Sequence, residues 1–144
     1  MFGLTFSESI YMTGNNTIKM LVIDDESDVI DLFSTYFDEE EISIVGATGA
    51  QDALEKLQET HIDVVITDII MPGQKDGLDV VVDIRESYPD ISIVAMTGFY
   101  DSKDKTGFLQ AAEALGADAI FYKPLSLKEL YDKVIELTDS KKAS

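Results

Sequence analysis

The chain has 144 residues, which is the size of one compact domain. Its 28 acidic against 11 basic residues give a formal net charge of −17, and such a surface repels phosphate backbones, so direct nucleic-acid binding is not expected. The chain has no cysteine, which excludes disulfides and thiolate metal sites, and its longest apolar runs are too short to span a membrane. These properties favour a cytoplasmic protein.

Residues 1–17 mix Gly, Ser, Thr and Asn with scattered apolar side chains and show no sustained periodicity. We interpret them as an N-terminal extension and leave open whether it is ordered or disordered. The regular pattern covers residues 18–138 and predicts one domain, and residues 139–144 are expected to form a C-terminal tail. The sequence leaves open whether this domain acts alone or is part of a longer protein.

Within residues 18–138, short apolar runs alternate with helical patterns five times. The runs are continuously apolar, which is typical of strands that are buried on both faces. The predicted strands are Lys19–Ile23, Ile42–Ala47, Val64–Thr67, Ile91–Met96 and Ala119–Tyr122. Helical spacing of apolar residues follows each run, and the last helix opens with Ser126 and Glu129 at the spacing of a capping box. This alternation predicts a parallel sheet covered by helices on both faces, with its functional crevice beyond the carboxyl ends of the strands.

Polar residues whose side chains can bind ions or react follow four of the predicted strands: Asp24 and Asp25, Asp68, Thr97, and Lys123. Three carboxylates close together require compensating cations, which Lys123 and a divalent ion can supply. Carboxylate oxygens without His or Cys suit Mg²⁺. Each residue alone also has an ordinary structural interpretation, such as a helix cap or a solvated lysine, but five such residues after four strands at one sheet edge favour a site.

This set of residues suits phosphoryl transfer to a carboxylate. Asp68 is the predicted nucleophile because it follows the most apolar strand, in a central position. Asp24 and Asp25 would hold the metal directly or through water, while the Thr97 hydroxyl and the Lys123 ammonium would contact phosphoryl oxygens.

Four stretches around these residues closely resemble the response-regulator receiver family (CheY-like) of two-component signal transduction. They are Met20–Glu26, Asp63–Gly73, Ile93–Gly98 and Gly116–Pro124. The resemblance implies a doubly wound, flavodoxin-like (βα)₅ fold with five parallel strands in the order 2-1-3-4-5. It also implies that Asp68 is the phosphoacceptor, that Asp25 and Asp68 ligate Mg²⁺ directly with the carbonyl of Ile70, and that Asp24 acts mostly through water.

The same resemblance implies a signalling switch that assists its own phosphorylation and dephosphorylation, rather than a conventional enzyme. The implied donor is a phosphohistidine on a sensor histidine kinase or a phosphotransfer protein. Thr97 would move inward on phosphorylation and reshape the face formed by the fourth helix, the fifth strand and the fifth helix. A downstream protein partner or output domain would read this face, and phosphorylation-linked pairing of two copies is left open.

The sequence departs from the family pattern in three places. Ile120 stands where family members usually carry Tyr or Phe, three positions before the lysine, and Phe121 faces the opposite side of the strand. This departure puts the usual coupling of Thr97 to an aromatic switch residue in question, whereas the phosphorylation chemistry does not depend on it. The stretch over residues 71–77 is one residue longer than usual, and the connection over residues 99–106 is also lengthened.

Three other functions compete with this interpretation. An aspartyl-phosphate phosphatase typically needs a second acid two residues after the nucleophile, where this chain has Ile70. A flavin-binding protein of the same fold would need a hydroxyl- and glycine-rich loop after the first strand, where this chain has acidic residues that repel a phosphate. A degenerate receiver that binds partners without phosphorylation is supported only by Ile120.

Overall fold

The computed structural model describes residues 17–38, 41–69, 77–98 and 110–143. The strands are β1 (Ile18–Ile23), β2 (Ile42–Ala47), β3 (Val64–Asp68), β4 (Ser92–Gly98) and β5 (Ala119–Lys123). The helices are α2 (Ser27–Phe37), α3 (Ala50–Glu59), α4 (Gly77–Ser87) and α6 (Leu127–Ala143), and residues 110–115 form a further helical stretch. Within these ranges, no helix combines the length and apolar character that crossing a membrane requires.

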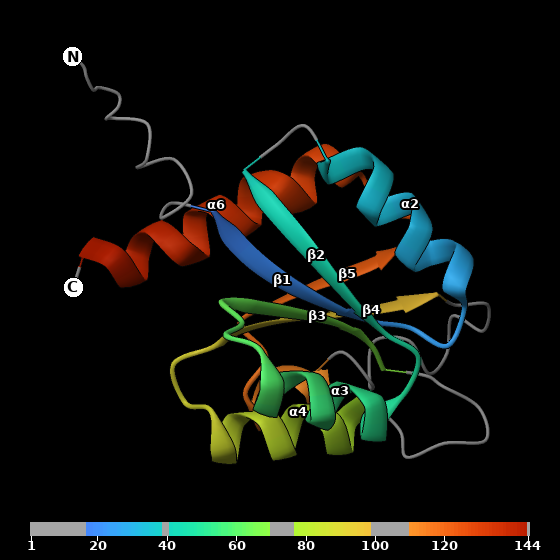
Figure 1. Ribbon diagram of the computed structural model, residues 1–144. Coiled ribbons are helices and arrows are strands. Elements are labelled where there is room, and N and C mark those ends of the chain that lie inside the picture. The colour runs from blue at the N-terminus through green and yellow to red at the C-terminus, as the bar shows by residue number, and fades with distance from the viewer. Residues whose placement is uncertain (1–16, 39–40, 70–76, 99–109, 144) are drawn as a thin grey trace.

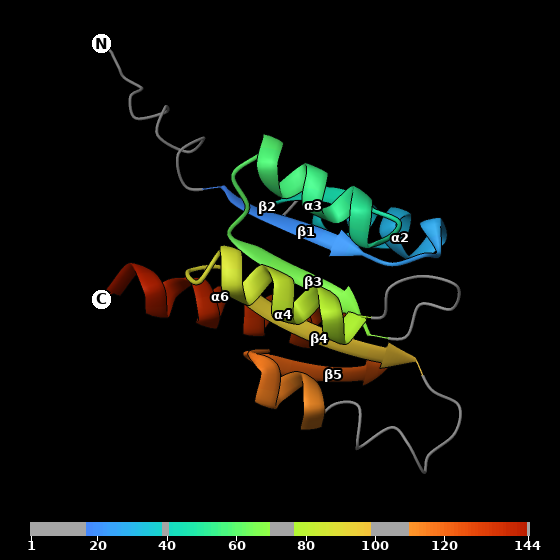
Figure 2. The same cartoon turned by 90° about the horizontal axis from the view of Figure 1, so that it is seen from below.

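The five strands form one sheet in the order β2-β1-β3-β4-β5, and all of its pairings are parallel. Helices α2 and α6 cover one face of the sheet, and α3 and α4 cover the other, as the views in Figure 1 and Figure 2 show. Because the strands are parallel, the chain must return from the end of one strand to the start of the next, and helices commonly form such crossover connections. The predicted doubly wound sandwich with strand order 2-1-3-4-5 is confirmed.

Two apolar cores lie on opposite faces of the sheet. In β1, Leu21 and Ile23 belong to the core beneath α3 and α4, whereas Met20 and Val22 belong to the core beneath α2 and α6. All four of these side chains are 0% exposed. Because successive side chains in a strand point to opposite faces, a strand covered on both sides must be apolar at every position, which explains the continuous runs in the sequence.

Aromatic packing joins α2 to α6 across one core. Phe37 stacks on Tyr131 with ring centroids 6.4 Å apart, and Phe33 meets Phe37 edge-on at 6.1 Å. Such pairs contribute about 0.5–1.5 kcal/mol each beyond the burial of their area. The predicted capping residue of α6 is also in place, because Ser126 Oγ accepts a hydrogen bond from the backbone N–H of Glu129 at 3.1 Å.

Arg85 on α4 links three segments on the other face. Its guanidinium donates hydrogen bonds to the carbonyls of Pro89, Ile91 and Gly116 and to the carboxylate of Asp118, at 2.7–3.2 Å. The planar five-donor fork of arginine suits this arrangement, and a lysine could not reproduce it. The contact therefore fixes the turn after α4 and the entry to β5.

The strand boundaries differ from the sequence-based prediction by at most two residues. Strand β4 continues to Gly98, and β5 continues to Lys123, because these two residues pair in register at the end of the sheet. Helix α6 continues to Ala143, past the predicted end of the domain at residue 138. Thr138 is buried, and its hydroxyl donates to the carbonyl of Val134 at 2.9 Å, so the helix remains packed at this point.

Candidate functional site

The predicted site residues lie at the carboxyl edge of the sheet. Asp24 follows β1 directly, Asp68 is the last residue of β3, Thr97 lies near the end of β4, and Lys123 ends β5. Register pairs Ile23 with Thr67 and Gly98 with Lys123, which aligns the ends of these strands. Figure 2 shows the ends of β1, β3, β4 and β5 along one edge of the sheet. The parallel sheet thus brings together residues that lie up to 99 positions apart in the chain.

Lys123 joins two of the carboxylates. Its Nζ lies 2.7 Å from Oδ2 of Asp24 and 3.0 Å from Oδ2 of Asp68. The Asp24 side chain is 0% exposed and the Asp68 side chain is 9% exposed, so the ammonium provides charge compensation that bulk water cannot. The lysine therefore connects β5 electrostatically to β1 and β3.

Asp24, Asp25 and Asp68 form one cluster of acidic groups. Each offers a carboxylate oxygen, and these oxygens lie within 4.8 Å of one another. Asp24 and Asp68 are buried, whereas Asp25 is exposed. The cluster carries a formal charge of −3, and Lys123 brings the total to −2. Uncompensated charge of this sign favours a divalent cation, and the all-oxygen donor set favours a hard one.

The two adjacent aspartates have different environments. The Asp24 backbone N–H donates to the carbonyl of Ala47 at 3.0 Å, which extends the β1–β2 ladder by one step. Its Oδ1 accepts a hydrogen bond from the backbone N–H of Glu26 at 2.9 Å, and its Oδ2 contacts Lys123. Asp24 is therefore fixed at both carboxylate oxygens. Asp25 is exposed at the mouth of the cluster, which is the better position for exchanging water or a metal ligand.

The pKa of Lys123 is shifted by competing effects. Burial of the ammonium lowers the pKa and is the largest single effect, but hydrogen bonds to Asp24 and Asp68 and the charges of these carboxylates oppose it. The net result is a pKa raised above the ordinary value of 10.5. Lys123 is therefore a permanent cation in the neutral pH range, suited to binding negative oxygens and unsuited to acting as a base.

Thr97 presents a buried hydroxyl at the carboxyl edge of the sheet. Its side chain is 0% exposed, and its Oγ1 has no hydrogen-bond partner in the described part of the structure. Most buried hydroxyls are hydrogen-bonded, and leaving one unsatisfied costs about 1–3 kcal/mol. A polar atom of this kind near the end of β4 is a donor for an oxygen-rich ligand.

Glycine at the start of α4 allows the helix to lie close to Asp68. The backbone N–H of Gly77 donates to the carbonyl of Ile69 at 3.2 Å. A Cβ added at Gly77 would collide with the Asp68 carbonyl oxygen and with Cα of Ile69. Only glycine fits this approach, so the residue supports the position of the phosphoacceptor candidate.

The remaining sequence-predicted residues divide into two groups. Ile70, the predicted carbonyl ligand, lies outside the described residues, as do most of the two lengthened connections. Ile120 packs against the core beneath α3 and α4, whereas Phe121 packs against the opposite core, as strand alternation predicts.

Tyr122, which has no role in the sequence-based prediction, lies beside Thr97 in the structure. Tyr122 pairs in register with Thr97 and is 42% exposed. Alternation from Ile120 predicts that Tyr122 shares its face of the sheet, so the position could have been identified from the strand pattern alone. An aromatic residue therefore lies on this face two positions from Ile120.

The fold and the acidic edge define a receiver-type α/β domain in which the Lys123 ammonium lies between carboxylates that follow β1 and end β3. The chain belongs to the response-regulator receiver family, because the family model for the response regulator receiver domain matches residues 20–135. As a member of this family, the chain is a two-component signalling module rather than a classical enzyme.

Individual relatives agree with this assignment. The chain is 35% identical over 111 residues to the response regulator SaeR of Staphylococcus epidermidis, covering 77% of this chain and 46% of that protein. It is 31% identical over 118 residues to SaeR of Staphylococcus aureus, covering 82% of this chain and 49% of the relative. The chain thus spans about half the length of these curated relatives. A receiver domain from Clostridium thermocellum superposes with a TM-score of 0.76 at 27% identity, covering 88% of this chain and 98% of that one.

Proposed function

We propose that this chain is a phosphorylation switch that accepts a phosphoryl group on Asp68. The observation that carries the proposal is the position of Lys123 Nζ, 2.7 Å from Asp24 and 3.0 Å from Asp68, within a cluster of three carboxylates. A partly buried, charged lysine beside a carboxylate at the carboxyl edge of a parallel sheet suits phosphoryl transfer better than it suits a structural ion pair.

The transfer is a displacement at phosphorus. An oxygen of the Asp68 carboxylate attacks the phosphorus of a phosphohistidine, the P–N bond breaks, and the imidazole leaves with its electron pair. The product is an acyl phosphate on Asp68. The ammonium of Lys123 compensates the negative charge on the phosphoryl oxygens, and the Thr97 hydroxyl donates a hydrogen bond to one of them. This bond would satisfy the Oγ1 atom that has no partner in the described residues.

The acidic cluster fits a Mg²⁺ ion. Its three carboxylates and one ammonium leave a formal charge of −2, which a divalent cation balances, and oxygen is the donor that Mg²⁺ prefers. Asp25 and Asp68 would hold the ion with the backbone carbonyl of Ile70, and Asp24 would act mostly through water. When bound, Mg²⁺ neutralises negative charge on the phosphoryl oxygens.

The switch would transmit phosphorylation to a protein partner. The phosphodonor would be a sensor histidine kinase or a phosphotransfer protein, and the reader would be a downstream protein or an output domain. Thr97 and Ile120 would couple the site to the face that includes β5, because both lie on the same side of neighbouring strands. Pairing of two phosphorylated copies is one form that this output could take.

Intact-mass analysis after incubation with acetyl phosphate tests the proposal. The expected result is one phosphoryl adduct on the parent chain that requires both Mg²⁺ and Asp68, so that Asp68→Asn shows none. Asp63→Asn is the matched control, because Asp63 directly precedes β3, at the opposite end of the strand from Asp68, and should not affect the adduct. A folded parent chain that forms no adduct would instead favour a receiver that binds its partners without phosphorylation.

A further inference from the structure

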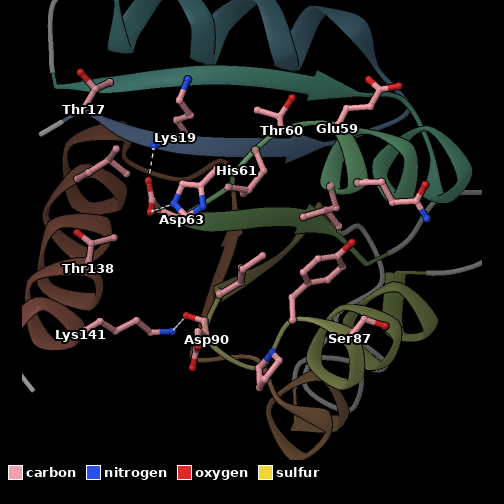
Figure 3. A pocket seen from close by; sticks show the side chains of 17 residues that line it. Thr17, Lys19, Glu59, Thr60, His61, Asp63, Ser87, Asp90, Thr138 and Lys141 are labelled. Atoms are coloured by element: carbon pink, nitrogen blue, oxygen red, sulfur yellow. Dashed lines mark hydrogen bonds and ion pairs between the residues drawn. The ribbon is translucent and has the colours of Figure 1, made fainter. Parts of the chain in front are cut away.

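A second concave surface lies at the opposite end of the molecule from the acidic cluster. It is a groove of about 1050 Å³ where β1 begins, between the turn before β3, the turn after α4 and the last turns of α6. Figure 3 shows these segments converging around the groove. The groove lies at the amino edge of the sheet, so it has no part in the phosphorylation chemistry.

The lining of the groove combines an apolar floor with a polar rim. Leu57, Ile62, Tyr88 and Ile91 supply the apolar surface, and three of them also belong to the core beneath α3 and α4. The floor therefore continues the hydrophobic core outwards to the surface. A groove of this composition gains most from an apolar occupant.

Several polar groups of the rim are already engaged with one another. His61 Nε2 lies 2.9 Å from Oδ1 of Asp63, and Oδ2 of Asp63 accepts the backbone N–H of Lys19 at 2.9 Å. Lys141 on α6 donates to the carbonyl of Asp90, and Figure 3 shows this contact across the mouth of the groove. Because these partners satisfy one another, the apolar floor is the surface of the groove that gains most from being covered.

The N-terminal extension begins at this groove. Thr17 is the first described residue and is itself part of the lining. Residues 1–16 carry a single charged side chain, Glu8, although charged residues make up 27% of the whole chain. Their large apolar side chains are Met1, Phe2, Leu4, Phe6, Ile10, Tyr11 and Met12. This composition is unlike that of a solvated linker, which is usually rich in charge and poor in aromatic residues.

The extension is also long enough to reach the floor. Ile10 lies seven positions before Thr17, and an extended chain spans at most about 3.5 Å per residue, so Ile10 can reach about 25 Å from the rim. A segment of the same chain binds without the loss of translational freedom that a separate molecule undergoes. The extension is therefore favoured over a separate molecule with the same side chains.

We propose that residues 1–16 dock into this groove of their own chain, with Phe6 and Ile10 packed on the apolar floor. The extension would then cover the amino edge of the sheet and leave the phosphorylation site open at the other edge. This proposal does not rest on the phosphoryl chemistry, and either one can fail without the other.

Paramagnetic relaxation in the full chain tests the docking. Because the chain lacks cysteine, Ser7→Cys provides a single attachment site for a nitroxide. Amide signals of residues 58–63 and 87–91 should lose intensity, and those of residues 24–26 at the other edge should not. Combined replacement of Phe6 and Ile10 by serine should restore the groove signals. Combined Thr5→Ser and Thr13→Ser is the matched control and should leave the loss unchanged.

The comparison between these variants decides the outcome. An equal loss of groove signals with and without Phe6 and Ile10 would mean that the tethered segment only samples the vicinity, and it would overturn the proposal. A mixture of nitroxide-labelled chains with unlabelled ¹⁵N chains separates the remaining case. Loss in that mixture would show that the extension of a second copy fills the groove, which would also overturn docking within one chain.

Discussion

Replacing Lys123 by methionine should destabilise the fold as well as the proposed chemistry. Methionine keeps the length and the apolar stem of the side chain but removes the ammonium. Asp24 and Asp68 would then face each other and Asp25 without the cation that contacts both of them. Two carboxylates in sites that are 0% and 9% exposed cannot replace that contact with full hydration.

The size of the effect follows from the burial of the three groups. Removing one partner of a buried ion pair costs about 3–5 kcal/mol because it leaves an uncompensated buried charge. The Lys123 side chain is 20% exposed, so water compensates part of the loss. We therefore expect a loss near the lower limit, about 3 kcal/mol of the free energy of unfolding.

Urea unfolding at neutral pH with a metal chelator present measures this loss. Lys128→Met is the matched control, because Lys128 also pairs with an aspartate, Asp132, at 3.1 Å, but the two side chains are 75% and 59% exposed. Solvent screens a pair this exposed, so this variant should unfold almost as the parent does. Excess Mg²⁺ should restore part of the stability of Lys123→Met, because it binds only the folded cluster.

Two results would refute this reasoning. One is a loss below about 1 kcal/mol for Lys123→Met, since that is the range of a surface pair. The other concerns Asp24→Asn, which removes one of the buried negative charges that Lys123→Met leaves without a cation. In that background Lys123→Met should cost clearly less than in the parent, and an unchanged cost would show that the lysine stabilises the fold through packing of its stem instead.

Three further predictions concern pH, α4 and the site. The pKa of Lys123 in the folded protein is raised above 10.5, so its contribution to stability is complete below pH 10.5 and is lost as the pH rises through the folded pKa. Urea unfolding at a series of alkaline pH values should show this loss in the parent and not in Lys123→Met. Arg85→Met should lower unfolding free energy by about 2 kcal/mol, measured with urea, by breaking the contact to Asp118 and its neighbouring carbonyls. Gly77→Ala should slow adduct formation with acetyl phosphate, measured by intact mass, because its Cβ would displace the backbone at Asp68; an unchanged rate would contradict this.

The sheet could be predicted from the sequence because its central strands are buried on both faces. Met20, Leu21, Val22 and Ile23 alternate between two cores, so every position is apolar and the run is easily recognised. Strand ends were less predictable, since Gly98 and Lys123 pair with each other for reasons of register that neither residue type indicates.

The contacts within the site required three-dimensional information. The sequence indicated that three carboxylates needed cations, but not that Lys123 contacts Asp24 and Asp68 together. Nor could it show that Asp24 would be buried and Asp25 exposed, because the two residues are chemically identical. The difference comes from the backbone of Ala47 and Glu26, which holds one of them inside.

Arg85 shows the limit of sequence-based reasoning more clearly. Its partners Gly116 and Asp118 lie 31 and 33 positions away in the sequence. Most of its acceptors are backbone carbonyls, which every residue type supplies, so the sequence does not identify them. The groove at the amino edge is similar, because its floor consists of residues such as Leu57 and Ile91 that also belong to the hydrophobic core, and apolar residue types do not distinguish these two environments.

Strand β5 combines what could and could not be predicted. Strand alternation correctly predicted that Ile120 and Phe121 lie on opposite faces of the sheet. Phe121 therefore does not supply an aromatic ring on the face of Ile120. The same rule places Tyr122 on the face of Ile120, and register sets it beside Thr97. At 42% exposure Tyr122 is half in solvent, whereas Ile120 is packed against the core. Any response of β5 to phosphorylation would therefore repack a branched aliphatic side chain next to an aromatic one that is already at the surface.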